Sequence, residues 1–159
     1  MPLPQIKNIL YTSSMGKHTR VVFRHAVQQA RLHQAQLHYL HVIEPIGEVG
    51  RALISGYLPQ EMIDKLHHEG LDNLKREITD RVDKFFAQEL AKLDDSERIE
   101  ITTLVVQGVR VETIIDVCRE LDADLIVMGS SKHLGRTSPT TKAVIKSGVS
   151  PVLVIPTHK

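Results

Sequence analysis

Residues Ala123 to Pro156 read ADLIVMGSSKHLGRTSPTTKAVIKSGVSPVLVIP, and this stretch decides the fold. It contains two unbroken apolar runs, Leu125 to Met128 and Val152 to Ile155, separated by a polar loop and a short helical pattern. Fully apolar runs joined by a helix are typical of buried parallel strands in a β-α-β unit. In such a unit the loop after the first strand lies at the carboxyl edge of the sheet, where open α/β folds bind ligands. Any binding chemistry is therefore expected near Gly129.

The rest of the chain repeats this alternation of strand and helix patterns. Strands are expected at 6–11, 37–43, 99–106, 123–128 and 151–155, and helices at 18–33, 59–93, 110–121 and 140–147. The longest helix carries an apolar stripe on which Gly70 falls, which predicts a kink or close packing at that residue. The alternation predicts one α/β domain, residues 1–159, with a doubly wound five-stranded parallel sheet and helices on both faces.

The composition limits the class of protein to which the chain can belong. The chain has 159 residues, of which 42% are hydrophobic and 25% charged, as in ordinary soluble globular proteins. The net charge of +1 argues against a general nucleic-acid or membrane-surface binder, because no basic excess is available to neutralise phosphates. The single cysteine, Cys118, excludes an internal disulfide, and neither a signal peptide nor a membrane span is visible. We expect a cytoplasmic protein.

Several motifs together resemble the universal stress protein family. They are DLIVMG and PVLVIP in the last third, KNIL near the start, HVIEP after the second expected strand, and Gly108 before the third expected helix. The resemblance covers nearly the whole chain. It implies the strand order 3-2-1-4-5, a nucleotide site at the carboxyl edge, and a homodimer built on the last strand, whose exposed apolar edge is a template for pairing. The resemblance does not indicate whether the protein also binds another protein.

The loop after Gly129 departs from the family's phosphate-binding motif. Family members usually have a second glycine where Lys132 stands here, and a third glycine followed by Ser or Thr where this chain has Ser138 and Pro139. The loop is also shorter than in the family. Because Pro139 has no N–H and two backbone donors are missing, we expect ATP affinity to fall about 10²- to 10⁴-fold. ATP is thus a cofactor of low affinity at most.

Basic residues in the same loop allow another reading. Lys132, His133 and Arg136 could attract a small anion beside the positive end of the last helix. The alternative is that these side chains are simply solvated, in which case the loop is better interpreted as a protein-contact surface.

Other candidate residues come from strand ends. Ser14, next to Ser13, stands where the family commonly has an Asp that holds the nucleoside, but both serines also suit a turn or a helix cap. Val42 matches a position whose backbone lines the adenine pocket, and Gly108 matches a glycine that admits a ligand or a tight turn. The candidate cofactor-binding residues are Ser13, Ser14, Val42, Gly108, Met128, Gly129, Ser130, Lys132 and Ser138.

The sequence predicts no metal site and no catalytic residue. The nine histidines include no HExxH motif, and His38 and His41 fall on opposite faces of their strand. Cys118 follows Ile114 and Ile115 on a helix and is expected in the core. The sequence therefore favours a non-enzymatic stress-response or regulatory protein with a degenerate ATP-binding loop. The alternative is a nucleotide-binding member with an atypical phosphate loop and slow ATP hydrolysis.

Overall fold

The computed structural model describes residues 1–13, 19–44, 60–130 and 138–157, with the side chains of 60–69 excepted. Its elements are β1 (Asn8–Thr12), α1 (Thr19–His33), β2 (Gln36–Ile43), α3 (Gln60–Ala91), a 3-10 turn (Asp95–Glu97), β3 (Ile101–Gln107), α4 (Arg110–Glu120), β4 (Leu125–Ser130), α5 (Pro139–Ser147) and β5 (Val152–Pro156). Every helix and strand expected from the sequence is present, with ends that differ by one or two residues.

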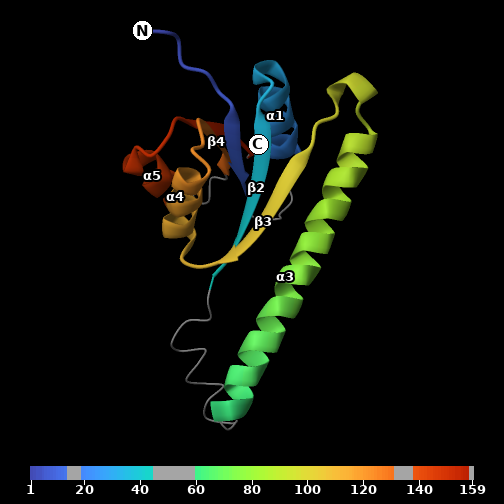
Figure 1. Ribbon diagram of the computed structural model, residues 1–159, viewed down its shortest axis with the longest axis vertical. Coiled ribbons are helices and arrows are strands. Elements are labelled where there is room, and N and C mark those ends of the chain that lie inside the picture. The colour runs from blue at the N-terminus through green and yellow to red at the C-terminus, as the bar shows by residue number, and fades with distance from the viewer. Residues whose placement is uncertain (14–18, 45–59, 131–137, 158–159) are drawn as a thin grey trace.

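The five strands form one sheet in the order β3-β2-β1-β4-β5, and every neighbouring pair is parallel. This confirms the predicted fold class and the strand order that the family resemblance implied. β1 lies at the centre, where Tyr11 is in register with Tyr39 of β2 and with Val127 of β4. Figure 1 shows α4 and α5 on one side of the sheet and α1 and α3 on the other.

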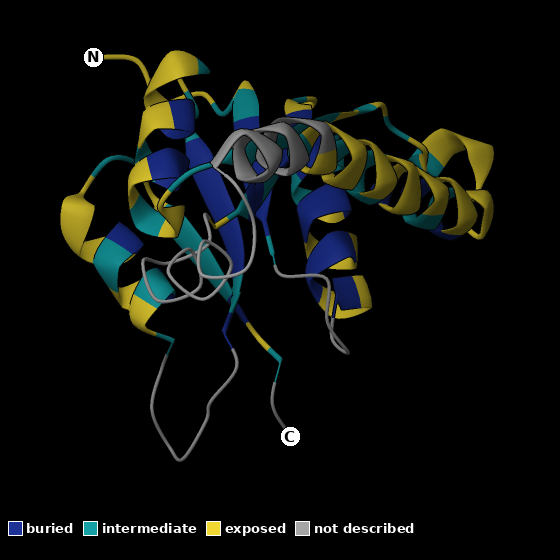
Figure 2. Ribbon diagram, turned by 90° about the horizontal axis from the view of Figure 1, so that it is seen from below, coloured by how far each residue is buried: buried dark blue, intermediate teal, exposed yellow. Residues whose placement is uncertain are grey.

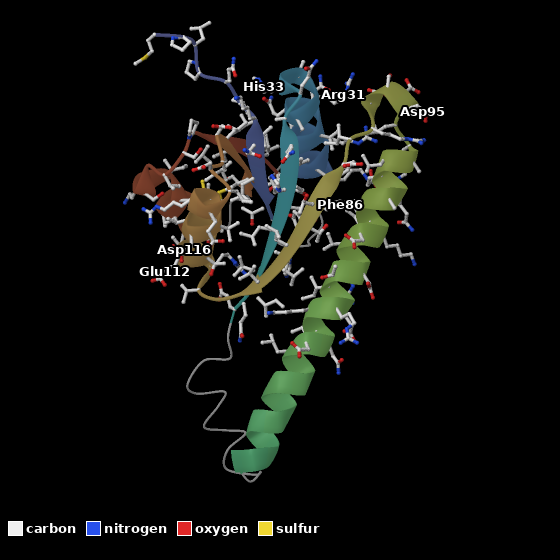
Figure 3. The ribbon with its side chains drawn as sticks, viewed as in Figure 1. Arg31, His33, Phe86, Asp95, Glu112 and Asp116 are labelled. Atoms are coloured by element: carbon white, nitrogen blue, oxygen red, sulfur yellow. The ribbon has the colours of Figure 1, made fainter. Side chains whose placement is uncertain are left out.

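An aromatic cluster fills the interface between the sheet, α1 and α3. The ring of Phe86 on α3 lies 5.1 Å from Tyr39 and 5.2 Å from Phe23 of α1, and Tyr11 contacts both Tyr39 and Phe86. Figure 3 shows Phe86 on the side of α3 that faces the strands. Burial of several rings at one point makes this cluster the main anchor of α3.

The opposite face of the sheet has an aliphatic core. Leu10, Leu40 and Ile126 of the strands pack there with Ile114 of α4 and Val144 of α5. Cys118 is buried in the same cluster, which confirms its expected place in the core. Figure 2 shows the buried strands enclosed between helices whose outer surfaces are exposed.

The start of β1 differs from the prediction for a chemical reason. The backbone N–H groups of Lys7 and Asn8 donate to the carboxylate of Asp124, at 2.8 and 3.0 Å, while the Asp124 N–H donates to the Asn8 carbonyl. The carboxylate thus takes the donors that would otherwise extend the ladder. β1 begins at Asn8 for this reason, although the apolar pattern begins at Ile6.

The expected close packing at Gly70 is wrong. A Cβ atom added there would have no neighbouring heavy atom within 4 Å, and the helix assignment of α3 runs through this residue without a break. Figure 1 shows the reason, because the first half of α3 extends beyond the end of the sheet.

Gly129 on β4, by contrast, is a close-packed position. A Cβ added to Gly129 would lie 2.8 Å from Cγ2 of Val22 on α1 and 3.2 Å from Cγ2 of Thr157. The only described glycine with positive φ is Gly148, so backbone conformation does not explain the glycine at 129. Contact between α1 and the end of β4 requires it.

These two glycines give a matched test of packing. We expect Gly129→Ala to lower the free energy of unfolding by about 1–3 kcal/mol, because Val22 must move. Gly70→Ala should raise the free energy of unfolding by roughly 0.5–1 kcal/mol, because alanine is the better helix former and its Cβ has no close neighbour. Urea denaturation at one fixed protein concentration measures both. An unchanged stability of Gly129→Ala would contradict the close contact.

Candidate functional site

The carboxyl ends of β1 and β4 lie side by side, with Thr12 in register with Met128. After β1 the chain continues to α1 on one face of the sheet, and after β4 to α5 on the other. Such a divergence opens a crevice outside the strand ends, which is where ligands bind in doubly wound folds.

A cavity of about 110 Å³ lies at this crevice. Its walls are the ends of three central strands and the first turns of α4 and α5. The lining residues are Thr12, Ser13, His41, Val42, Arg110, Ile114, Met128, Gly129, Ser138, Thr140 and Thr141.

Two helix N-termini meet at this cavity. α4 begins at Arg110 and α5 at Pro139, and both first turns contribute lining residues. Helix N-termini carry backbone N–H groups without intrahelical partners and a partial positive charge, so they favour anions. Pro139, as the first residue of α5, removes one such donor. The Ser138 side chain makes no capping hydrogen bond and so keeps its hydroxyl for another partner.

Side chains at the strand ends are hydrogen-bonded into the core. The Thr12 hydroxyl donates to the Leu40 carbonyl at 2.9 Å, and the Tyr39 hydroxyl donates to the Ser13 carbonyl at 3.1 Å. Burial raises the pKa of Tyr39 to about 12 and also raises the pKa of Tyr11. Both phenols are therefore neutral at physiological pH, and the Tyr11 hydroxyl accepts a hydrogen bond from the Ser13 hydroxyl at 3.4 Å.

His41 and Arg110 supply the titratable chemistry of the cavity. His41 is half-buried, and burial together with the Arg110 guanidinium lowers the pKa of its imidazole below the usual value. Arg110 makes an ion pair with Glu44, with 3.4 Å between Nε and Oε1, and both side chains are about half exposed. The cavity thus offers one neutral imidazole, one guanidinium and several hydroxyls.

Five of the predicted site residues line this one cavity. They are Ser13, Val42, Met128, Gly129 and Ser138. Ser14 and Lys132 lie outside the described residues, as do His133 and Arg136, on which the anion hypothesis for the loop depends. The binding role of each residue stays a prediction.

Two other candidate residues, Ser130 and Gly108, have structural roles and do not line the cavity. The Ser130 carbonyl accepts hydrogen bonds from the Thr157 N–H and hydroxyl, at 3.0 and 2.9 Å, which joins the end of β5 to β4. A Cβ at Gly108 would collide with Oγ1 of Thr113 on α4. Gly108 therefore admits a neighbouring side chain, and neither residue is among those that line the cavity.

Sequence reasoning did not select His41, Arg110, Thr140 or Thr141 as binding residues. A polar side chain near the end of an apolar strand, such as His41, is a signal for the carboxyl edge. Arg110 is the first helical residue after Gly108. A cation at the N-terminus of a helix interacts unfavourably with the helix dipole. Its presence there can therefore indicate that an anion binds nearby.

A second cavity, of about 190 Å³, lies between α1 and the segment that follows α3. It is larger, but three of its polar side chains, Arg31, Glu97 and Gln28, are paired with one another. Arg31 lies 3.6 Å from Glu97 and 3.0 Å from the side-chain oxygen of Gln28. We therefore take the cavity at the carboxyl edge as the candidate site.

The described part of the chain lacks two further features. No group of three or more His, Cys, Asp or Glu side chains in that part of the chain could hold a metal ion. None of the described helices combines the length and apolar character needed to cross a bilayer.

Comparison with known proteins identifies the family. The model of the universal stress protein family matches residues 5–156. The universal stress protein of Methanocaldococcus jannaschii is 25% identical over 156 residues, which cover 94% of each chain. Universal stress protein UspA from Lactobacillus plantarum has a similar structure, with a TM-score of 0.72, 22% identity and coverage of 96% of this chain and 99% of that one. The universal stress protein from Archaeoglobus fulgidus in complex with dAMP matches with a TM-score of 0.56 and 18% identity, over 94% of this chain and 97% of that one. The chain belongs to the universal stress protein family.

Proposed function

We propose that the protein is a non-enzymatic stress-response regulator of the cytoplasm, which acts as a homodimer and binds a nucleotide weakly at the carboxyl-edge cavity. The observation that carries this proposal is the meeting of five predicted site residues around one cavity at the switch point of the sheet. A structure of a relative in complex with dAMP supports a nucleotide as the ligand.

The apolar part of the cavity suits a nucleobase. Val42, Ile114 and Met128 provide apolar contact, and the strand ends present backbone groups that can bond a base edge. Ligand pockets generally combine such an apolar lining with a few placed polar groups.

The polar part suits a small anion better than a triphosphate. Pro139 removes a backbone donor, and the guanidinium of Arg110 is already paired with Glu44. The described lining residues include no carboxylate that could hold Mg²⁺ for ATP.

A second candidate function is nucleotide binding with slow ATP hydrolysis. The observation that favours it is the presence of His41, with its lowered pKa, beside Arg110 in the same cavity. A neutral imidazole can act as a general base and a guanidinium can stabilise a transferring phosphoryl group.

Calorimetry with Mg-ATP separates these functions. We expect a dissociation constant above roughly 100 μM, because the phosphate loop lacks backbone donors. A low-micromolar constant that Ser138→Ala weakens would favour the second candidate. Ser138→Ala is a sharper probe than any change at Gly129, because a Cβ at 129 would disturb Val22.

The dimer proposal rests on the free edge of β5. Among the described strands β5 pairs with β4 alone, and its first three residues, Val152, Leu153 and Val154, are half-buried. At the other edge of the sheet, Thr103 of β3 donates to the carboxylate of Asp83 on α3 at 2.9 Å. An uncovered apolar edge is a template for pairing, and a second copy of β5 is the partner we propose.

The ladder between β4 and β5 shows which backbone groups face outward. Ile126 N–H donates to the Pro151 carbonyl, and Thr157 N–H donates to the Ser130 carbonyl. Because alternate residues of a strand face the same neighbour, the odd-numbered residues of β5 bond β4. Val152 and Val154 therefore present their backbone groups to the free edge.

Val154→Pro tests this edge. The change removes an outward N–H and leaves the β4 ladder intact, since proline is tolerated where the N–H faces away from the sheet. We expect light scattering to give twice the 17.9 kDa chain mass for the wild type and the single mass for Val154→Pro. Val154→Thr keeps the N–H and should remain dimeric. A monomeric wild type at micromolar concentration, or a dimeric Val154→Pro, would contradict the proposal.

A further inference from the structure

The protons that Tyr39 and His41 carry determine which ring nitrogen of His41 donates a hydrogen bond and which one accepts. The Tyr39 hydroxyl has one proton and donates it to the Ser13 carbonyl at 3.1 Å, because a carbonyl can only accept. The same oxygen lies 3.4 Å from Nδ1 of His41. Nδ1 must then carry a proton and donate it to the Tyr39 oxygen. The other ring nitrogen, Nε2, is left as an acceptor.

The surroundings of His41 keep the ring in this neutral form. Burial and the positive charge of Arg110 both disfavour a protonated imidazole. Arg110 reaches the cavity from α4, and Glu44 follows β2 and pairs with Arg110. At neutral pH the described cavity wall therefore has an acceptor nitrogen on β2 and a guanidinium on α4.

Nε2 has no hydrogen-bond partner among the described residues, and the Arg110 guanidinium is held only by a long, half-exposed contact to Glu44. A ligand that satisfies both groups must carry a hydrogen-bond donor and an anionic group. The hydroxyls and the phosphate of a ribose phosphate have these properties.

Resting on the proposed function, we propose that His41 and Arg110 select the ligand of this cavity as a ribose monophosphate ester of the nucleoside monophosphate class. Nε2 of His41 accepts a hydrogen bond from a ribose hydroxyl, and Arg110 binds the phosphate in place of the missing backbone donors of the phosphate loop. Glu44 competes with the phosphate for Arg110 and so limits the affinity.

Three ligands and four variants test the assignment by calorimetry. The ligands are AMP, adenosine, and 2′,3′-dideoxy-AMP, which lacks both ribose hydroxyls. Arg110→Gln should weaken AMP by about 10-fold or more and leave adenosine unchanged, because a charge-assisted bond is lost. Glu44→Gln should tighten AMP several-fold without affecting adenosine. A gain of affinity cannot arise from a merely damaged fold.

His41→Phe should weaken AMP about 2- to 10-fold and abolish the preference for AMP over dideoxy-AMP. Because Phe cannot bond Tyr39, His41→Gln serves as the conservative variant. It keeps an acceptor and should retain part of that preference. Circular dichroism checks that each variant is folded.

The outcomes distinguish the two levels of the proposal. If the wild-type protein binds neither AMP nor adenosine at millimolar concentration, the proposed function itself fails, and with it the inference. If it binds AMP but Glu44→Gln does not tighten binding, or the preference for AMP over dideoxy-AMP survives in His41→Phe, the cavity binds nucleotide and the assignment of His41 and Arg110 is overturned.

Discussion

The parallel pairing of β1 with β4 is the contact on which the rest of the structure depends. It places Thr12 beside Met128 and sends the following segments to opposite faces of the sheet. No helix can then cover both strand ends, and the first turns of α4 and α5 border the space that remains. The cavity is a direct consequence of the topology, which is why it lies at the same edge in folds of this class.

The aromatic cluster connects this edge to the rest of the molecule. Tyr11 and Tyr39 pack their rings against Phe86, while the Tyr39 hydroxyl reaches the Ser13 carbonyl and lies next to His41. The packing that holds α3 against the sheet therefore also orients the polar atoms of the cavity wall. A substitution in the cluster would therefore disturb the site even where no ligand touches the changed residue.

The sequence predicted the helices, the strands and their order. It did not show why individual residues occupy their positions. Apolar runs such as Leu125 to Met128 indicated buried strands because burial on both faces leaves no polar alternation. The start of β1 escaped prediction, because the Asp124 carboxylate that binds its first backbone N–H groups comes from a distant part of the chain. Gly129 lines the cavity, and the structure also gives it a packing role against Val22 that the sequence does not indicate. His41 and Arg110 were missed as a pair, because they meet only once β2 and α4 have packed together.

The central claim is that the carboxyl-edge cavity is the ligand site. The most direct measurement is an amide NMR titration of the isotope-labelled protein with AMP. The account predicts that the largest shift changes fall at Ser13, Val42, Gly129 and Thr140, which come from four separate segments around one cavity. It is contradicted if millimolar AMP moves no amide, or if the largest changes lie along α1 between Phe23 and Arg31, beside the other cavity.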